Sequence, residues 1–346
     1  MLPEDQLIGR IAAALGSSGP SAFANLVVGI GDDAAVISTG SGTEWALSCD
    51  CSLEGVHFQA DLHPSDSVGY KALARATSDL AAMGAKPRFF LLTLALPNSR
   101  TGEWLDQFLV GLRRAARQFG MRLIGGDTTR SRAVFISITV VGENPARRAI
   151  RRSGARPGDR IYVSGGNLGA AQLGLLLLKT GAAIQPRPKQ AKGSRRWLSS
   201  ALQAHLHPQI RVDLGAFLAR HQVASAMIDI SDGLSSDLAR LCAASRVGAR
   251  VWAQSIPCVE LPVGPKTAGH LPGGLNRLQL ALDGGEDYEL LFTVPPEKEK
   301  RLRQAPGFTK LTQIGEIVPG RRAILVDTRG REKPVLAAGW DPFRGR

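Results

Sequence analysis

The chain has 346 residues, 44% of them hydrophobic, and a formal net charge of +13, values typical of a globular protein with two ordinary domains. Its longest apolar runs, 89–96 and 173–178, are too short to span a bilayer, so no membrane association is expected. The first residues contain no basic or apolar targeting segment and the four cysteines have no Cys-x-x-Cys spacing, so we expect a cytoplasmic protein with reduced thiols.

The first distinctive segment is Gly29–Ile37, which follows a helix predicted over 7–15 from the spacing of its apolar residues. Glycines allow a tight turn and a close approach to a ligand, and the adjacent Asp32 and Asp33 repel each other unless a cation or a donor lies between them. The segment therefore predicts a loop that holds a divalent metal, with an ordinary solvated turn as the alternative.

A strand and a helix follow, and each carries an acidic residue. Alternation over Trp45–Asp50 places Ser48 and Asp50 together on one face of the strand. Apolar spacing predicts a helix over 65–85, with Asp79 at the edge of the apolar stripe among small residues. Asp79 is therefore either a solvated helix residue or a ligand.

The rest of the first half continues this alternation of strands, helices and acidic loops. The apolar run 89–96 predicts a buried strand, and an amphipathic helix (104–119), a second Gly-Gly-Asp loop ending at Asp127 and a strand (134–141) follow. The next segment, 144–159, is rich in Arg, Pro and Gly. We place a domain boundary there, which divides the chain into domains 1–145 and 146–346.

The second half begins with a strand at 160–164, the turn Gly165–Gly169 and a Leu-rich helix. The turn fits neither the dinucleotide-binding fingerprint nor a P-loop. The remaining predictions are a helix over 209–220, a buried strand ending in Asp229, Ser231 and Asp232, a third Gly-Gly-acid loop with Glu286 and Asp287, a strand over 289–294 and a last strand near 312–318.

The positive charge makes nucleic-acid binding an alternative function. Much of this charge lies in 147–160, in 187–196 and near the C-terminus, and no aromatic residues alternate with it as a stacking platform requires. Proline and glycine within 186–196 oppose regular structure, so we predict a mobile basic surface loop there. Solvated loops explain the charge better than a nucleic-acid interface does.

Six aspartates lie at or near element ends, most of them beside glycine or another small residue: Asp33, Asp50, Asp79, Asp127, Asp229 and Asp232. Ligand sets made only of oxygen suit Mg²⁺, which commonly shares its coordination with substrate phosphates. Phosphoryl transfer needs mainly positioning and charge neutralisation. Several Mg²⁺ ions could therefore take the place of the P-loop lysine that the chain lacks.

These motifs resemble those of the thiamine-monophosphate kinase family, in the same order and over nearly the whole chain. The motifs are Gly-Ile-Gly-Asp-Asp33, Ser48-Cys-Asp50, Glu54-Gly-Val-His57-Phe, Ser78-Asp79-Leu-Ala-Ala-Met-Gly-Ala, Gly-Gly-Asp127-Thr-Thr-Arg, Arg152-Ser-Gly-Ala, Asp229-Ile-Ser231-Asp232-Gly-Leu and Gly-Gly-Glu286-Asp287-Tyr-Glu-Leu. The resemblance implies an α+β fold of the aminoimidazole ribonucleotide synthetase type, with an N-terminal sheet domain that forms a homodimer and a C-terminal α/β domain that completes the active site. It also implies Mg²⁺-dependent and ATP-dependent phosphorylation of thiamine monophosphate to thiamine diphosphate.

The resemblance also implies roles for individual residues. Those at magnesium positions are Asp33, Ser48, Cys49, Asp50, Asp79, Asp127, Asp229 and Asp232. Those at ATP positions are Gly126, Asp127, Arg152 and Ser231, and those at substrate positions are His57, Glu286 and Trp340. No catalytic base is expected, because the phosphate that accepts the new group is already ionised at neutral pH.

Two positions depart from the family's pattern. Cys49 stands where the family usually has Thr, and a thiol is a poor Mg²⁺ ligand, so this contact would come from the backbone carbonyl. Pro342 alters the usual C-terminal motif beside Trp340. The enzymatic alternative is an amide- or selenide-activating synthetase of the same superfamily, although the chain lacks the reactive Cys or Sec that a selenide enzyme would need in a Gly-rich N-terminal segment.

Overall fold

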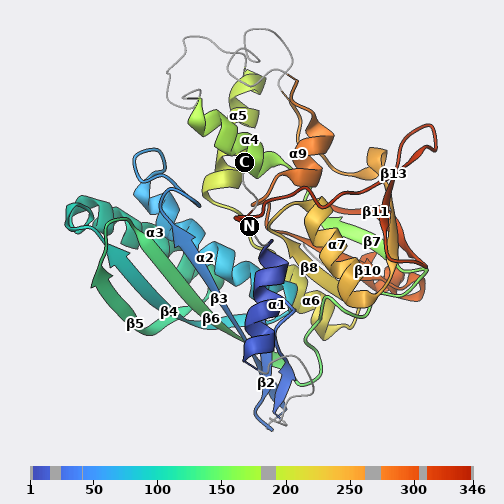
Figure 1. Ribbon diagram of the computed structural model, residues 1–346, viewed down its shortest axis with the longest axis horizontal. Helices are drawn as coiled ribbons and strands as arrows, with labels where there is room; N and C mark the ends of the chain where they lie inside the picture. The colour runs from blue at the N-terminus through green and yellow to red at the C-terminus, as the bar shows by residue number, and fades with distance from the viewer. Residues whose placement is uncertain are drawn as a thin grey trace.

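A computed structural model describes the chain over residues 3–15, 25–40, 42–180, 192–261, 274–303 and 310–343. Within these ranges each half of the chain forms one mixed sheet with helices packed on it, as the predicted α+β class requires (Figure 1). The helix α2 lies between the two halves and packs on strands of both. None of the described helices is long and apolar enough to cross a membrane.

The N-terminal sheet has six strands in the order β1-β2-β3-β6-β4-β5, and only the β4–β5 pair is parallel. The helices α2 and α3 cover one of its faces. The bounds in this half are α1 (Glu4–Ala14), β1 (Leu26–Val28), β2 (Ala35–Ser38), β3 (Thr43–Leu53), α2 (Ser65–Ala82), β4 (Lys86–Leu96), the 3-10 turn η1 (Asn98–Arg100), α3 (Glu103–Phe119), β5 (Arg122–Arg130) and β6 (Phe135–Pro145).

The C-terminal sheet has seven strands in the order β13-β12-β9-β11-β7-β10-β8, and only the β12–β9 pair is parallel. The helix α7 packs on one face, and α6 packs on the other. The bounds are β7 (Arg160–Ser164), α4 (Ala170–Lys179), α5 (Lys192–Leu206), α6 (Val212–Arg220), β8 (Ala226–Ile230), α7 (Leu234–Ser245), β9 (Gly248–Trp252), η2 (Ala253–Ser255), α9 (Arg277–Asp283), β10 (Glu289–Val294), η3 (Pro296–Lys298), α10 (Glu299–Arg303), β11 (Leu311–Val318), β12 (Ala323–Val326) and β13 (Glu332–Pro334).

Within the part of the chain that the structure describes, one face of the N-terminal sheet is open. Alternate residues of β6 are buried against α2, but on the other face the apolar side chains of Leu53 and Leu91 each remain 37% exposed. The prediction of a strand buried on both faces at 89–96 is therefore wrong for one face. A continuous apolar run cannot distinguish burial inside a domain from burial by a partner.

Three other predictions are wrong in detail. The Gly-Gly-Asp segment expected as a loop lies inside β5, where a Cβ at Gly126 would lie 1.8 Å from the Leu92 carbonyl oxygen, so glycine lets this strand approach β4. Two more strands, β12 and β13, follow the strand expected to be the last. Residues 192–196 begin α5 rather than a loop, since Lys, Arg, Ala and Leu after the prolines favour a helix, and 186–191 lie outside the described residues.

Candidate active site

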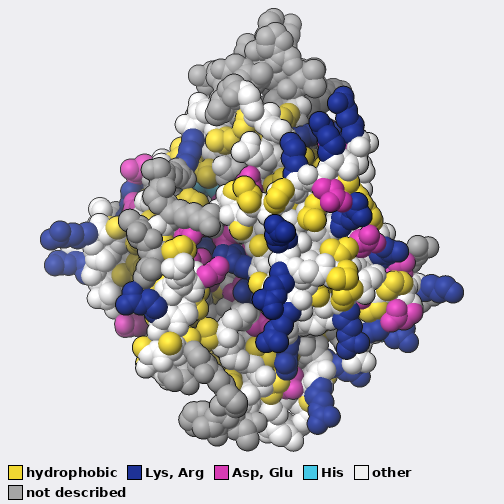
Figure 2. Space-filling model, turned by 45° about the vertical axis from the view of Figure 1, so that its right-hand side comes forward, with side chains coloured by type: hydrophobic (Ala, Val, Ile, Leu, Met, Phe, Trp, Pro, Cys, Tyr) yellow, Lys and Arg dark blue, Asp and Glu magenta, His cyan; other side chains and the backbone are white. Residues whose placement is uncertain are grey.

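A cleft of about 1360 Å³ opens between the two halves of the molecule. Its acidic lining comes from both halves, with Asp50 on β3 and Asp79 on α2 facing Asp229, Asp232 and Glu286 from the second half. Figure 2 shows acidic side chains in the recess on the left of this face, with Lys and Arg prominent over the convex surface to the right. A basic surface around an acidic recess attracts anionic ligands at long range.

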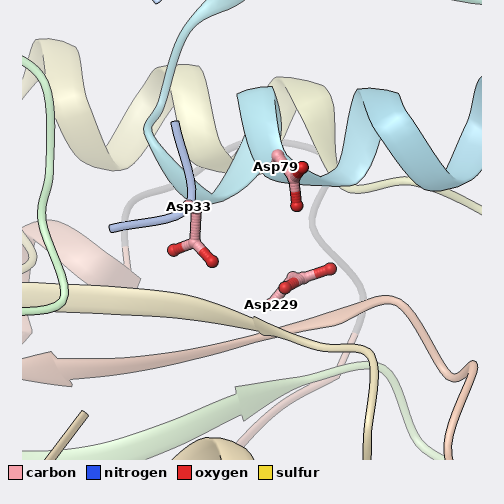
Figure 3. A group of neighbouring side chains, drawn as sticks. All are labelled: Asp33, Asp79 and Asp229. Atoms are coloured by element: carbon pink, nitrogen blue, oxygen red, sulfur yellow. The ribbon is translucent and has the colours of Figure 1, made fainter. Parts of the chain in front are cut away.

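Three aspartates converge at the centre of this region. Asp79 comes from the last turn of α2, Asp229 from β8 and Asp33 from the loop before β2, and their carboxylates point toward one another (Figure 3). One oxygen of each lies within 4.8 Å of the others. Three carboxylates at this separation are the arrangement that a shared cation requires.

Hydrogen bonds orient this trio but leave one oxygen without a partner. Ser48 donates to Asp79 Oδ2 at 2.5 Å, and Ser78 donates to Asp229 Oδ2 at 2.7 Å. Arg152 Nη2 donates to Asp33 Oδ1 at 2.7 Å, whereas the buried Asp33 Oδ2 accepts no hydrogen bond from any described residue. A buried, unpaired carboxylate oxygen is costly unless a cation binds it, so the site fits a divalent metal ion.

The electrostatics of the trio agree with this interpretation. Burial, followed by repulsion from Asp33, raises the pKa of Asp229 to about 7. Burial and the neighbouring carboxylates also raise the pKa of Asp79 well above its usual range, and burial raises that of Asp33. A bound cation would relieve this repulsion and allow all three groups to ionise.

Two arginines that the sequence did not predict at the site, Arg75 and Arg240, pair with acidic residues beside the trio. Arg75 Nε lies 3.2 Å from Asp50 Oδ2, and Arg240 contacts Asp232 and donates to Asp237 at 2.8 Å. Arg75 lies four residues before Asp79, so the helical period places both on one face of α2, a signal that the sequence did contain. Nothing comparable in the sequence marked Arg240.

Asp237 also fixes the loop that follows β8. Its Oδ2 accepts the backbone N–H groups of Asp232 and Gly233, both at 3.1 Å. Ser231 and Asp232, which directly follow β8, therefore have a defined backbone position at the cleft. The C-terminal segment packs on this loop, because the Trp340 N–H donates to the Asp232 carbonyl oxygen at 3.0 Å.

The three residues predicted to contact the substrate all line the cleft: His57, Glu286 and Trp340. His57 Nδ1 accepts the Leu53 N–H at 3.0 Å, so the neutral ring carries its proton on Nε2. Burial, with a contribution from Arg75, lowers the pKa of His57 to about 4, which keeps the ring neutral. Pro342 does not move Trp340 away from the cleft, to which both residues contribute.

Two predicted site residues, Gly126 and Asp127, lie away from the trio. Across the sheet, Asp50 is opposite Ile138, Ile138 opposite Leu92 and Leu92 opposite Gly126. Three strand spacings separate Gly126 from Asp50 by roughly 14 Å. Asp127 is the next residue and points to the opposite, open face, so it cannot join the carboxylates of its own chain.

Cys49 lies between the cleft and the open face of the N-terminal sheet. It borders the cleft, but strand alternation turns its side chain to the open face, where Sγ lies 3.4 Å from Ser137 Oγ. Cys49 can therefore reach the face of β3 that carries Asp50 only through its backbone atoms. This geometry agrees with the expectation that any metal contact at this position comes from the carbonyl oxygen.

Comparison with known proteins gives matches over both halves of the chain. Residues 31–144 match the family "AIR synthase related protein, N-terminal domain", and residues 156–328 match "AIR synthase related protein, C-terminal domain". The "Thiamine-monophosphate kinase" of Salmonella typhimurium is 39% identical over 297 residues, which cover 84% of this chain and 85% of the relative. That of Escherichia coli K12 is 36% identical over 318 residues, 91% of this chain and 92% of the relative.

Solved structures give the same result. The structure described as "AaThiL complexed with AMPPCP and TMP" superposes with a TM-score of 0.79 at 31% identity and covers 99% of this chain and 97% of its own. The hydrogenase maturation protein HypE in complex with ATP gives a TM-score of 0.62 at 18% identity, covering 93% of this chain and 89% of its own, which shows a shared fold alone.

Proposed function

The chain belongs to the thiamine-monophosphate kinase family, and from this membership we propose that it transfers the γ-phosphate of ATP to thiamine monophosphate, which yields thiamine diphosphate. The observation that carries the proposal is the buried trio Asp33, Asp79 and Asp229, with its unpaired oxygen, in a cleft that His57, Glu286 and Trp340 also line. The relative solved with AMPPCP, an ATP analogue, and TMP supports the same pair of substrates.

We propose Mg²⁺ as the cation at this site, because every side-chain donor in the trio is an oxygen. Bound Mg²⁺ neutralises phosphate charge and orients the phosphates for in-line transfer. Asp50 and Asp232 line the cleft outside the trio, so engaging all five carboxylates requires more than one ion. Ser48 supports the assignment by holding Asp79 in a fixed orientation.

The chain's own residues account for the binding of the two anionic substrates. His57 can donate its Nε2–H to the phosphate of the acceptor, and Trp340 offers a ring face to the thiamine rings. Arg152 and Ser231 are proposed to contact ATP, with Arg152 already close to the trio through Asp33. No residue has to remove a proton, because the attacking phosphate oxygen is ionised.

We further infer a homodimer formed through the open face of the N-terminal sheet. The exposed apolar side chains of Leu53 and Leu91 support this, since an uncovered apolar sheet face is unfavourable in water. Asp127 lies on the same face. The proposal that it contacts metal and ATP is therefore compatible with the fold only if Asp127 serves the cleft of the partner subunit.

Acceptor selectivity tests the proposed function. Purified protein with Mg-ATP is given thiamine monophosphate or free thiamine at equal concentration, and ADP and thiamine diphosphate are quantified. We expect one ADP per thiamine diphosphate and a kcat/KM for free thiamine at least about 100-fold lower, since its hydroxyl needs a base that the proposed site does not provide. Comparable kcat/KM values for the two acceptors would contradict the proposal.

A further inference from the structure

A buried polar network reaches one oxygen of Glu286 from behind the cleft. Lys71 Nζ on α2 lies 2.8 Å from Glu286 Oε2, and His205 Nδ1 on α5 lies 3.2 Å from the same oxygen. The side chains of Lys71 and His205 are 10% and 1% exposed, so both contacts are shielded from water. An ion pair in such surroundings fixes geometry far better than a surface pair does.

The histidines extend this network to the backbone. His63 Nε2 lies 3.1 Å from His205 Nε2, and His63 Nδ1 accepts the Gln59 N–H at 3.1 Å. If His63 Nδ1 is an acceptor, its Nε2 carries the proton and donates to His205 Nε2, and His205 Nδ1–H then donates to Glu286. Burial lowers the pKa of both histidines, in agreement with this neutral chain of donors.

The backbone of Glu286 also indicates that its position is constrained. Its φ is +70°, a left-handed conformation that a residue with a Cβ adopts only at a cost. The Glu286 N–H donates to the Ser231 carbonyl oxygen at 2.7 Å, which ties this conformation to the loop after β8. Strain of this kind is retained where the direction of a side chain matters.

The contacts of Glu286 from behind the cleft are made through one of its two carboxylate oxygens. Both of these contacts are made to Oε2, and Glu286 lines the cleft. We propose that Lys71 and His205 are positioning residues, which hold Glu286 so that Oε1 accepts a hydrogen bond from the exocyclic amine of the substrate's aminopyrimidine ring. This inference rests on the proposed function, because that substrate carries such an amine at the end remote from its phosphate.

Replacement of the amine tests the specificity. Thiamine monophosphate is compared with oxythiamine monophosphate, in which an oxygen replaces the amine, using wild type, Lys71→Met, Glu286→Gln and the double variant. We expect wild type to prefer the amine by about tenfold or more in kcat/KM, as sites that pair a substrate N–H do. Each single variant should lower this preference at least threefold and raise the KM for thiamine monophosphate, with the KM for ATP changed less than twofold.

The double variant decides whether Lys71 acts through Glu286. If it does, Lys71→Met added to Glu286→Gln causes no further loss of preference, and the double variant matches Glu286→Gln. This comparison remains informative if Lys71→Met alone folds poorly, because the double variant leaves no unpaired buried charge. Independent, multiplicative effects of the two changes, or an unchanged preference in Glu286→Gln, would overturn the proposal.

Tyr70→Phe is the matched control. Tyr70 precedes Lys71 on α2, and its hydroxyl lies 3.1 Å from the Pro208 carbonyl oxygen, so this variant also breaks a buried link from α2 to the second half. We expect it to leave the amine preference unchanged. A preference lowered as much as in Lys71→Met would mean that any loosening of α2 has this effect, which contradicts a specific role for Lys71.

Thermal unfolding separates a failure of this inference from a failure of the proposed function. The same four proteins form a double-mutant cycle in Tm, measured without any substrate. Coupling between Lys71 and Glu286 is expected whatever the enzyme phosphorylates, and its absence would overturn the positioning contact. If wild type does not phosphorylate thiamine monophosphate but the coupling is present, the proposed function and the hydrogen bond to the substrate amine are both wrong. The positioning contact between Lys71 and Glu286 is then still supported.

Discussion

Asp229 is buried beside Asp33 and Asp79, and burial, followed by repulsion from Asp33, raises its pKa. Its pKa of about 7 in the folded chain exceeds the ordinary aspartate value, so between these values the folded state binds a proton that the unfolded state has released. The contribution of Asp229 to stability therefore falls as pH rises from the ordinary aspartate pKa to about 7, and it changes little above that. Buried histidines oppose this trend below pH 6.5, because the pKa of His57 is lowered to about 4.

Comparison with Asp229→Asn isolates this carboxylate, since the histidines are common to both proteins. In the metal-free state we expect wild type to lose Tm relative to the variant as pH rises from 5 to 8. Mg²⁺ should raise the Tm of wild type more at pH 8 than at pH 6, and should raise that of Asp229→Asn far less. Equal Mg²⁺ responses in both proteins would argue against metal binding at the trio.

Asp50 offers a test of function in which the native fold is expected to be kept. We expect Asp50→Asn to lower kcat by at least about 100-fold, because less phosphate charge is neutralised in the transition state. The circular dichroism spectrum should stay that of wild type. Asp61→Asn is the control, since Asp61 also pairs with an arginine but its side chain is 92% exposed and does not line the cleft. Near-normal turnover of Asp50→Asn at saturating Mg²⁺ would refute its role.

The helix α2 brings Lys71, Arg75 and Asp79 to the cleft, and its position depends on close packing against α3. A Cβ at Gly111 would lie 1.6 Å from the Asp66 carbonyl oxygen, which is rigid backbone rather than a movable side chain. Gly111→Ala should therefore force the helices apart and lower the free energy of unfolding by about 1–3 kcal/mol or more.

Urea denaturation measures this effect. Gly9→Ala in α1 is the matched control, because nothing lies within 4 Å of its new Cβ and alanine favours a helix over glycine. That variant should be neutral or slightly stabilising. If Gly111→Ala is equally well tolerated, the α2–α3 packing has more room than these distances indicate.

The sequence predicted most elements of the described chain because its periodicities are local. The strand at 226–230 and the helices at 65–85 and 104–119 all occur close to their expected bounds. The Gly-Gly-Asp127 segment was misassigned to a loop, because its glycines serve a close approach to β4 rather than a turn. That distinction depends on a strand distant in sequence and has no local signal.

The candidate site could also be predicted from local sequence signals, but only in part. Six aspartates at or near element ends were identified as candidate metal ligands, and three of them, Asp33, Asp79 and Asp229, do converge. Arg75, which pairs with Asp50, and Arg240, which pairs with Asp232 and Asp237, were missed, because the pairing of side chains from different elements follows from the tertiary fold and only the helical spacing of Arg75 and Asp79 pointed to one of them. The contribution of Lys71 and His205 to Glu286 could not be foreseen, since it joins three segments far apart in the chain.

At the scale of the whole molecule, the open sheet face and the position of Asp127 both predict a dimer in which each active site uses residues of both subunits. Asp127→Asn and Asp229→Asn should each be inactive alone. If Asp127 serves the partner's cleft, their heterodimer regains one intact site, and co-expression with random pairing should restore about a quarter of wild-type activity. Size-exclusion chromatography with light scattering would confirm the dimers. Absence of any recovery in a dimeric mixture would contradict a shared site.

The central claim is that this cleft transfers a phosphate from ATP to the phosphate of thiamine monophosphate, and ³¹P NMR tests it most directly. Wild type and Asp79→Asn are incubated with Mg-ATP and thiamine monophosphate in parallel. For wild type the account predicts equal losses of the γ-phosphate and thiamine monophosphate signals, with matching gains of ADP and thiamine diphosphate, and no change for Asp79→Asn. Release of inorganic phosphate from ATP while the thiamine monophosphate signal stays constant would contradict it.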